Sequence, residues 1–433
     1  MKRRIKIVWL CTFSDEKLRK HLSFPKYYWG NLIRRIFKKP FINDFAVWDS
    51  NARNEFEKFV DEVELHIISP HSGISKLHEF EENGLYYHIF WEEKEILKEL
   101  IKRKYNRSAI DSFGKSRKLI LNLINKINPD LVHVIGIENK FHSMAALDIS
   151  SSVPVIAQLQ TLVSDSRFKE NTSVSSDEYC YNSYIEQQIM LRSDYIATPV
   201  ERFAEVIRKS IKPNAIILRM GLMLKEPLVI EETKKEFDFV YWALDISKTA
   251  DLVLEAFSIA NKIKPEITLD IIGGYSPEYK KILDEHIERL GVSGKVKFEG
   301  KLPTHDDVLK QIRKSRFALL PLKIDIVSGT IREAMANGLP VLTTITPGTP
   351  KLNEKRECVM LSETGDHKAL AENMIKLLDN ERYANLLREN SRLTSSEQAS
   401  NADMAMCWLE SYKACIENFK KGTKIKENLL AKF

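Results

Sequence analysis

Cysteines are scarce in this sequence and form no pattern. The five are Cys11, Cys180, Cys358, Cys407 and Cys415, and none belongs to a Cys-x-x-Cys pair. An odd and scattered set of this kind argues against a disulfide framework and against a zinc site. We therefore expect a reducing, cytoplasmic environment.

Long apolar runs are also missing. No stretch of about 18 apolar residues occurs, so the sequence predicts no membrane span. Residues 1–13 join a basic head to an apolar stretch, but Lys6 interrupts that stretch and no small-residue cleavage site follows. A first buried strand explains them better than a signal peptide does. At 433 residues the chain is long enough for two or three domains.

Basic charge is concentrated near the start of the chain. The net charge is +6, yet residues 1–60 hold 14 Lys and Arg against 6 Asp and Glu. Residues 32–41 interleave bases with apolar side chains, and Tyr27, Tyr28 and Trp29 come just before them. Such a segment could lie on an anionic membrane surface, or it could be a solvated helix covering a core edge. Nucleic acid is not an expected partner, because no recognised nucleic-acid-binding motif accompanies the charge.

Apolar, β-branched runs alternate with helical patterns along most of the chain. This alternation predicts parallel sheets covered on both sides, and the right-handed crossover rule then gives a doubly wound fold. We expect an α/β protein with two Rossmann-like doubly wound domains facing a central cleft. The expected strands are 4–11, 63–69, 85–90, 131–136, 153–159, 195–198 and 216–221, then 237–242, 267–274, 296–300, 317–321 and one at Val341.

The charged residues 225–235 contain a proline and predict a linker. We expect an N-terminal domain over 1–222, a C-terminal domain over 223–396, and C-terminal helices over 397–433. Trp408, Tyr412 and Phe419 are the candidates for packing those helices back towards the N-terminal domain. Residues 165–177 are polar and serine-rich, and predict a mobile loop.

The stretch 328–344 predicts a capped helix followed by a buried strand. Ser328 is a good N-cap, and Gly338 with Pro340 ends the helix. Apolar residues recur at helical spacing and form the packed face, so Glu333 falls on another face. Free backbone N–H groups near the helix start favour a phosphate, and a carboxylate beside them suits the hydroxyls of a ribose. The alternative is an ordinary capped helix with a solvated glutamate.

Other candidates lie where strands of the second half end, because ligands of open α/β sheets bind at these carboxyl ends. Lys248 opens a helix and could meet a phosphate, or it could be a surface lysine. Gly273-Gly274 would let backbone approach a ligand, although no Gly-x-Gly-x-x-Gly pattern supports NAD. Asp325 lies eight residues before Glu333, and could hold a sugar hydroxyl, face a developing positive charge or simply form a turn.

Several longer runs form a consistent set. They are EAMANGLPV at 333–341, DLVLEAF at 251–257, LDIIGG at 269–274, VKFEG at 296–300 and ALLP at 318–321, with PDLVH at 129–133 and RSDYIA at 192–197 in the first half. From about residue 237 to 378 the sequence resembles the GT-B glycosyltransferases of the large retaining family usually called family 4.

This resemblance implies roles for particular residues. It places Glu333 at the nucleotide ribose and Asp325 near the donor sugar, at a position where the family has a glutamate. Lys248 matches the family's phosphate-binding lysine, whereas Leu244 stands where an arginine is usual. Gln160 stands where a histidine is often found near the donor sugar. The implied catalytic residues are Asp325, Glu333 and Lys248.

The resemblance also implies how the donor is bound and activated. The implied donor-binding residues are Glu333, Ser328, Gly329, Thr330, Lys248, Gly273, Gly300 and Leu302. Lys248 and backbone N–H groups at the helix start would stabilise the leaving diphosphate, so no metal or other cofactor is expected. The leaving phosphate would take the acceptor's proton, and the two domains would close to exclude water.

The function implied is a retaining glycosyltransferase of cell-surface polysaccharide or glycoconjugate synthesis. It would move a sugar from a nucleotide-diphosphate sugar to a saccharide or lipid-linked acceptor held by the N-terminal domain. Two alternatives stay open: a nucleotide-sugar epimerase-like GT-B enzyme, and a catalytically weak GT-B binding protein, for which Leu244 and Gln160 are the reasons. We expect a cytoplasmic location, with peripheral contact at the inner membrane face through the basic segment.

Overall fold

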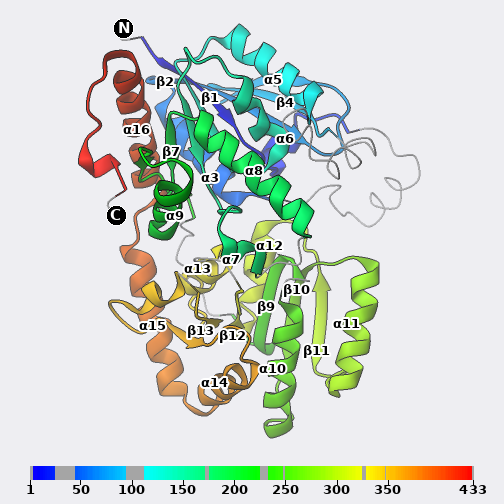
Figure 1. Ribbon diagram of the computed structural model, residues 1–433. Coiled ribbons are helices and arrows are strands. Elements are labelled where there is room, and N and C mark those ends of the chain that lie inside the picture. The colour runs from blue at the N-terminus through cyan, green and yellow to red at the C-terminus, as the bar shows by residue number, and fades with distance from the viewer. Residues whose placement is uncertain are drawn as a thin grey trace. The chain divides into compact units, whose positions relative to one another are not determined.

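The computed structural model describes residues 3–24, 44–93, 112–170, 175–224, 233–246, 249–323, 328–346 and 348–431. The chain divides into two compact units (Figure 1). Unit 1 comprises Met1–Met223 together with Ala399–Phe433, and unit 2 comprises Leu224–Gln398. Most of the expected linker, residues 225–232, lies outside the described residues, as does the basic segment at 27–41.

Unit 1 is built on an eight-stranded sheet with the order β3-β4-β2-β1-β5-β6-β7-β8. Neighbouring strands are parallel except for the antiparallel pair β3 and β4. The strands are β1 (Ile5–Leu10), β2 (Val63–His71), β3 (His78–Glu82), β4 (Leu85–Trp91), β5 (Leu131–Ile135), β6 (Val155–Gln158), β7 (Tyr195–Ala197) and β8 (Ile216–Leu218). Its α-helices are α1 (Glu16–Arg19), α3 (Val47–Phe56), α5 (Gly114–Ile127), α6 (Lys140–Ser143), α7 (Ser166–Glu170), α8 (Ser176–Arg192), α9 (Glu201–Val206) and α16 (Asn401–Lys421).

Helix α16 packs into the core of unit 1 although it follows unit 2 in the sequence (red in Figure 1). Trp408 and Tyr412 are fully buried there, whereas Phe419 is only partly buried. The Tyr412 hydroxyl accepts from Trp9 Nε1 at 2.9 Å and lies 2.7 Å from His133 Nδ1. Burial lowers the pKa of His133 to about 3, so its imidazole is neutral and can accept the Tyr412 proton. This chain of bonds ties α16 to β1 and β5.

Unit 2 is built on a six-stranded, fully parallel sheet with the order β11-β10-β9-β12-β13-β14. This is the Rossmann order, in which the chain reverses direction across the sheet between its first and fourth strands. The strands are β9 (Phe237–Asp245), β10 (Leu269–Gly274), β11 (Val296–Gly300), β12 (Ser315–Leu319), β13 (Val341–Thr344) and β14 (Val359–Ser362). The α-helices are α10 (Ala250–Ile263), α11 (Pro277–Leu290), α12 (His305–Ile312), α13 (Gly329–Ala336), α14 (His367–Asp379) and α15 (Glu381–Glu397).

The two parallel sheets confirm the expected α/β fold with two Rossmann-like domains. Two local expectations are wrong. The predicted loop at 165–177 contains helix α7, and α8 begins within it at Ser176. The strand expected at 317–321 lies two residues earlier, at Ser315–Leu319, where Ser315 already pairs with Phe237 in the sheet.

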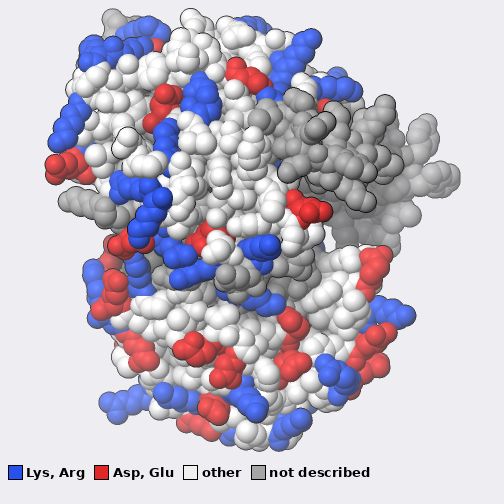
Figure 2. Space-filling view, viewed as in Figure 1, with Lys and Arg blue, Asp and Glu red and all other residues white. Residues whose placement is uncertain are grey.

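Charge is mixed on the described surface. On the face shown in Figure 2, basic and acidic side chains are interspersed over unit 2 and do not collect in one field of a single sign. Within the described part of the chain, no helix combines the length and the apolar character that a membrane span requires.

Candidate functional site

The carboxyl ends of β9 and β12 mark the switch point of the unit 2 sheet, where open α/β sheets bind ligands. Helix α13 follows β12 and begins at this edge. The Ser328 side chain caps it by accepting from Thr330 N at 3.2 Å, and its Oγ lies 2.5 Å from Thr330 Oγ1. Ile331, Ala334 and Met335 are fully buried, which confirms the predicted packed face. The cap leaves the first backbone N–H groups of the helix at the ligand-binding edge.

Glu333 lies just beyond the first turn of α13 with its side chain only 16% exposed. The Trp242 indole, from β9, donates to Glu333 Oε2 at 2.8 Å. The other oxygen, Oε1, lies 4.0 Å from the position that a Cβ on Gly329 would occupy, so the carboxyl group reaches back over the helix start. His305, the first residue of α12, places Nε2 3.8 Å from Oε1. The carboxyl group is therefore oriented by the Trp242 indole on β9, with the His305 imidazole on α12 beside its other oxygen.

Trp242 and His305 are not among the residues expected from the sequence. Trp242 is 91 residues from Glu333 in the chain, and an apolar strand residue gives no signal of a polar role. Tyr275, close to Gly300, is another residue that the sequence does not single out. It directly follows β10, is 36% exposed and lies edge-to-face with Phe298 at 6.3 Å between ring centroids.

The predicted glycines serve different purposes. Gly273 has φ +149°, and a Cβ there would overlap the Ala243 carbonyl oxygen and come within 2.6 Å of Ile246 Cγ2. Packing inside unit 2 thus requires a glycine at position 273. Gly300 has φ +70°, and a Cβ placed there would have a single neighbour within 4 Å among the described residues, the Tyr275 hydroxyl at 3.8 Å. Leu302 packs partly buried against the unit 2 core. Among the described residues, the space beside Gly300 is therefore bordered by the Tyr275 hydroxyl.

Several predicted residues cannot be placed. Lys248 and Asp325 lie outside the described residues, and so does the side chain of Leu244. Leu244 belongs to β9, Lys248 follows β9 in the sequence, and Asp325 follows β12. Their roles at the donor therefore stay predictions from the resemblance.

Gln160 is described and lies in unit 1, just after β6. With its amide oriented to satisfy both neighbours, it accepts from Trp48 Nε1 at 3.0 Å and donates to Glu138 Oε1 at 2.9 Å. Burial raises the pKa of Glu138 to about 8. Gln160 is thus part of a polar group at the carboxyl end of the unit 1 sheet.

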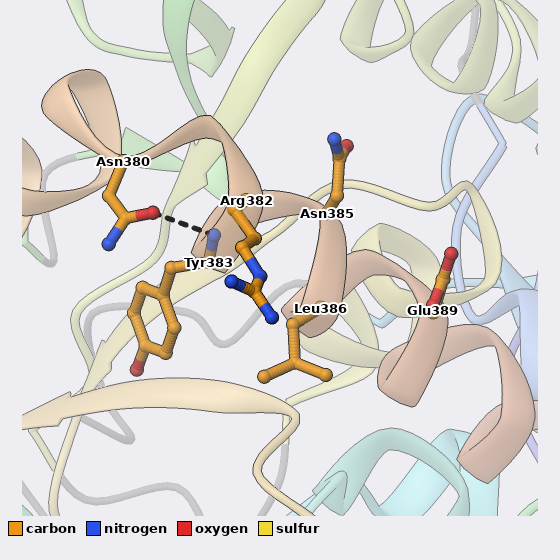
Figure 3. Close-up of a pocket in the computed structure, with 6 residues that line it drawn as sticks. All are labelled: Asn380, Arg382, Tyr383, Asn385, Leu386 and Glu389. Carbon is orange, nitrogen blue, oxygen red and sulfur yellow. Dashed lines mark hydrogen bonds between the residues drawn. The ribbon is translucent and has the colours of Figure 1, made fainter.

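An open hollow lies on α15, lined by Asn380, Arg382, Tyr383, Asn385, Leu386 and Glu389 (Figure 3). It does not belong to the carboxyl edge of the sheet. Arg316, at the start of β12, pairs with Glu381 at 3.4 Å, which puts the beginning of α15 at the amino edge. Ligands of parallel sheets bind at the opposite edge, so we do not assign the donor to this hollow.

Comparisons with known proteins point to one group. Residues 225–394 match the family model described as "Glycosyl transferases group 1". N-acetyl-alpha-D-glucosaminyl L-malate synthase of Bacillus anthracis is 24% identical over 199 residues. That match covers 46% of this chain and only about half, 50%, of the relative's length.

Solved structures extend the likeness over both units. Sucrose-phosphate synthase from Thermosynechococcus elongatus has a TM-score of 0.69 at 13% identity, covering 95% of this chain and 98% of that one. Anabaena HepE, solved in complex with UDP and glucose, has a TM-score of 0.62 at 13% identity, covering 95% and 100%. At such low identity the likeness shows the fold, which is GT-B.

Proposed function

We propose that this chain, whose second unit is a group 1 glycosyltransferase domain, transfers a sugar from a nucleoside-diphosphate sugar to a hydroxyl-bearing acceptor. The observation that carries the proposal is the setting of Glu333. Its carboxyl group is held by the Trp242 indole and reaches back over the capped start of α13, at the switch point of a Rossmann sheet. That position suits hydroxyl donors beside a phosphate group, as in a nucleotide.

The parts of the donor would be divided among the elements of unit 2. Glu333 accepts hydrogen bonds from the ribose hydroxyls, and the N–H groups at the start of α13 face the diphosphate. The base lies in the open space bordered by Gly300, Leu302 and the exposed ring of Tyr275. UDP is a reasonable first nucleotide to test, because HepE was solved with it.

Catalysis would follow the scheme implied by the family resemblance. Lys248 and the start of α13 stabilise the negative charge that develops on the leaving diphosphate. Asp325 would lie near the sugar. The acceptor hydroxyl would attack the anomeric carbon from the face that the diphosphate leaves and give its proton to the leaving phosphate, so the anomeric configuration would be retained. We propose that no metal takes part, since Lys248 and the start of α13 already stabilise the negative charge on the leaving diphosphate. Activity should therefore be unchanged by EDTA.

A donor screen tests the proposal. The protein is mixed with UDP-, GDP- and ADP-sugars, and thermal shift is measured together with release of the nucleoside diphosphate. One nucleotide class should raise Tm by several degrees. The matching nucleotide sugar should be slowly hydrolysed, and NMR identifies the anomer of the sugar that is released. If no donor gives a thermal shift and none is hydrolysed, the enzyme assignment is refuted. Conversion of the donor sugar without transfer would favour an epimerase-like enzyme, and binding without turnover would favour a binding protein.

The acceptor, the pathway and the membrane contact belong to the proposal as well. We propose a saccharide or lipid-linked acceptor in polysaccharide or glycoconjugate synthesis, bound by unit 1. The basic segment at 27–41 is proposed to contact anionic lipid from the cytoplasmic side. Flotation with liposomes, with and without anionic lipid, should show binding that weakens as salt is added.

A further inference from the structure

Helix α15 has two faces, and one of them packs into the interior of unit 2. The buried face carries four small or apolar residues at helical spacing, which are Ala384, Leu387, Ser391 and Ser395. Ala384 and Leu387 belong to the hydrophobic core of the unit. One such face is what a surface helix needs in order to fold onto its domain, so the rest of α15 could be entirely polar.

A second stripe on the same helix faces solvent and is not entirely polar. It consists of Arg382, Leu386, Glu389 and Leu393, all of which are exposed. Leu386 is 48% exposed and Leu393 is 53% exposed. The steps between the four residues are four, three and four, which is the spacing of the contact line between two paired helices. Single exposed leucines are ordinary, but two on one such line indicate a surface that another helix can cover.

The two charged residues of the stripe lie on either side of Leu386. Arg382 comes one turn before it and Glu389 about one turn after it, and Figure 3 shows all three lining the hollow on α15. Arg388 is the charged neighbour that interacts with Glu389 along the helix. Within the described part of the chain, the Arg382 and Glu389 side chains form no ion pair or hydrogen bond with each other or with another residue. Both charges are therefore available to a partner.

This order of charges is complementary to itself. In a parallel pair of α15 helices, Arg382 would face the partner's Arg382 and Glu389 would face the partner's Glu389, and like charges would repel each other. In an antiparallel pair that crosses at Leu386, Arg382 faces the partner's Glu389 on both sides of the crossing. A twofold axis gives the antiparallel arrangement, because it brings the same patch of two copies together.

We propose that the α15 stripe is a self-association surface, through which two copies of this chain form an antiparallel, twofold-symmetric dimer. The crossing point lies near the start of α15, where Glu381 pairs with Arg316 at the amino edge of the unit 2 sheet. It is therefore away from the edge where the donor is proposed to bind. The stripe covers only about three helical turns, so the interface should be small and the dimer weak, with a Kd of about 10–100 µM.

Sedimentation velocity of the full-length protein at about 1 to 200 µM is the direct test. The average mass should rise from that of a monomer towards that of a dimer. Leu386→Glu places two like charges at the crossing and should weaken the association by about tenfold or more. Leu191→Glu is the matched control, because Leu191 is 49% exposed on α8 of unit 1 and does not belong to the stripe. This control should associate as the wild type does.

Charge reversal tests the antiparallel arrangement. Arg382→Glu and Glu389→Arg each bring like charges together and should weaken the association by about three- to tenfold. The double variant exchanges the two charges and should associate as the wild type does. An equimolar mixture of the two single variants should associate as well, because a chain with two acids in the stripe then faces a chain with two bases.

The outcomes separate the surface from its arrangement and from the donor site. If the wild type stays monomeric up to the highest concentration, or if Leu386→Glu associates equally well, the surface is refuted. If neither the double variant nor the mixture restores association, the antiparallel arrangement is refuted. The unfolding temperature of each variant shows whether the fold is intact, since exposed substitutions should change stability little. The dimer does not depend on the transferase assignment, so either proposal can fail while the other stands.

Discussion

Each unit has a tryptophan near the switch point of its sheet. The indole N–H donates a hydrogen bond in both units, but the two acceptors differ. In unit 2, Trp242 donates at 2.8 Å to the carboxyl group of Glu333 beside the start of α13. In unit 1, Trp48 donates at 3.0 Å to the amide of Gln160, which donates to Glu138, a carboxyl group whose pKa burial raises to about 8. The same kind of sheet edge therefore surrounds a carboxyl group with an indole in one unit and with an amide in the other.

The glycines near these sites differ in a similar way. Gly273 in unit 2 is confined by backbone, whereas Gly136 in unit 1 is confined by the ends of two side chains. Side-chain ends can move and a strand backbone cannot, so a Cβ should be tolerated less well at Gly273 than at Gly136.

Substituting these two glycines should give the largest effect. Gly273→Ala forces a Cβ into the Ala243 carbonyl and should destabilise unit 2 by more than about 4 kcal/mol. Gly136→Ala should cost about 1–2 kcal/mol, because the end of the Gln160 side chain can shift. Urea unfolding measures the stability of both variants. Gly291→Ala, at φ +72° in open space, is the control for positive φ alone. Equal destabilisation by the first two variants would contradict the distinction.

Removing the Glu333 carboxyl group should give the next largest effect. Glu333→Ala should weaken nucleoside-diphosphate binding by about ten- to a hundredfold, because hydrogen bonds from ribose hydroxyls to a charged group are lost. Calorimetric titration measures the affinity. Glu372→Gln, an exposed acid on α14, is the matched control and should bind the nucleotide as the wild type does. Unaltered nucleotide affinity in Glu333→Ala would remove the basis of the proposed donor site.

Tyr412→Phe should affect unit 1 alone. It leaves Trp9 Nε1 and His133 Nδ1 without their buried partner, which should cost about 1–3 kcal/mol. The matched variant in unit 2 is Tyr383→Phe, whose hydroxyl bonds to Glu357 at an exposed site and should matter little. Scanning calorimetry with and without nucleotide assigns the affected transition. A loss of stability confined to the nucleotide-stabilised transition would show that α16 does not support unit 1 as described.

The smallest effect should be a change in pH dependence. Folded Glu138 keeps its proton up to about pH 8, whereas the unfolded chain releases it near its ordinary pKa of 4.5. The folded state therefore binds more protons between these values, and its stability falls as pH rises from about 4 to 8. Glu138→Gln should flatten this decline, so that its Tm gains a few degrees on the wild type at pH 8 relative to pH 5. Identical slopes would mean that Glu138 ionises normally, and Glu372→Gln should leave the slope unchanged.

The sequence predicts the sheets better than the sites. Strand β11 lies at the predicted residues 296–300, and the Ser328 cap forms as expected, because both depend on local pattern. Strand β3 escapes prediction because His78–Glu82 is mostly polar and is held only by its antiparallel pairing with β4. Helix α7 escapes because short polar helices lack an apolar repeat.

The site was predictable only where a single side chain carries its chemistry. Glu333 could be found from its place in a helix, but its contact with Trp242 joins residues far apart in the sequence. Asp49 resembles any helical aspartate until burial shows that its oxygens lack partners. Burial is a property of the assembled fold, and no local pattern encodes it.

Because α16 belongs to unit 1, unit 2 is an insertion in the topological sense, and this orders events during translation. The ribosome delivers all of unit 2 before it delivers the helix that covers Trp9 and His133. Residues beyond that helix also close the open side of β8, where Leu218 forms an antiparallel bridge with Leu430 and Ala431 N donates to Ile217 O. Until they arrive, β8 offers an unpaired strand edge to other nascent chains. Chaperone dependence and co-translational aggregation should therefore depend on how soon residues 399–431 follow unit 2 out of the ribosome.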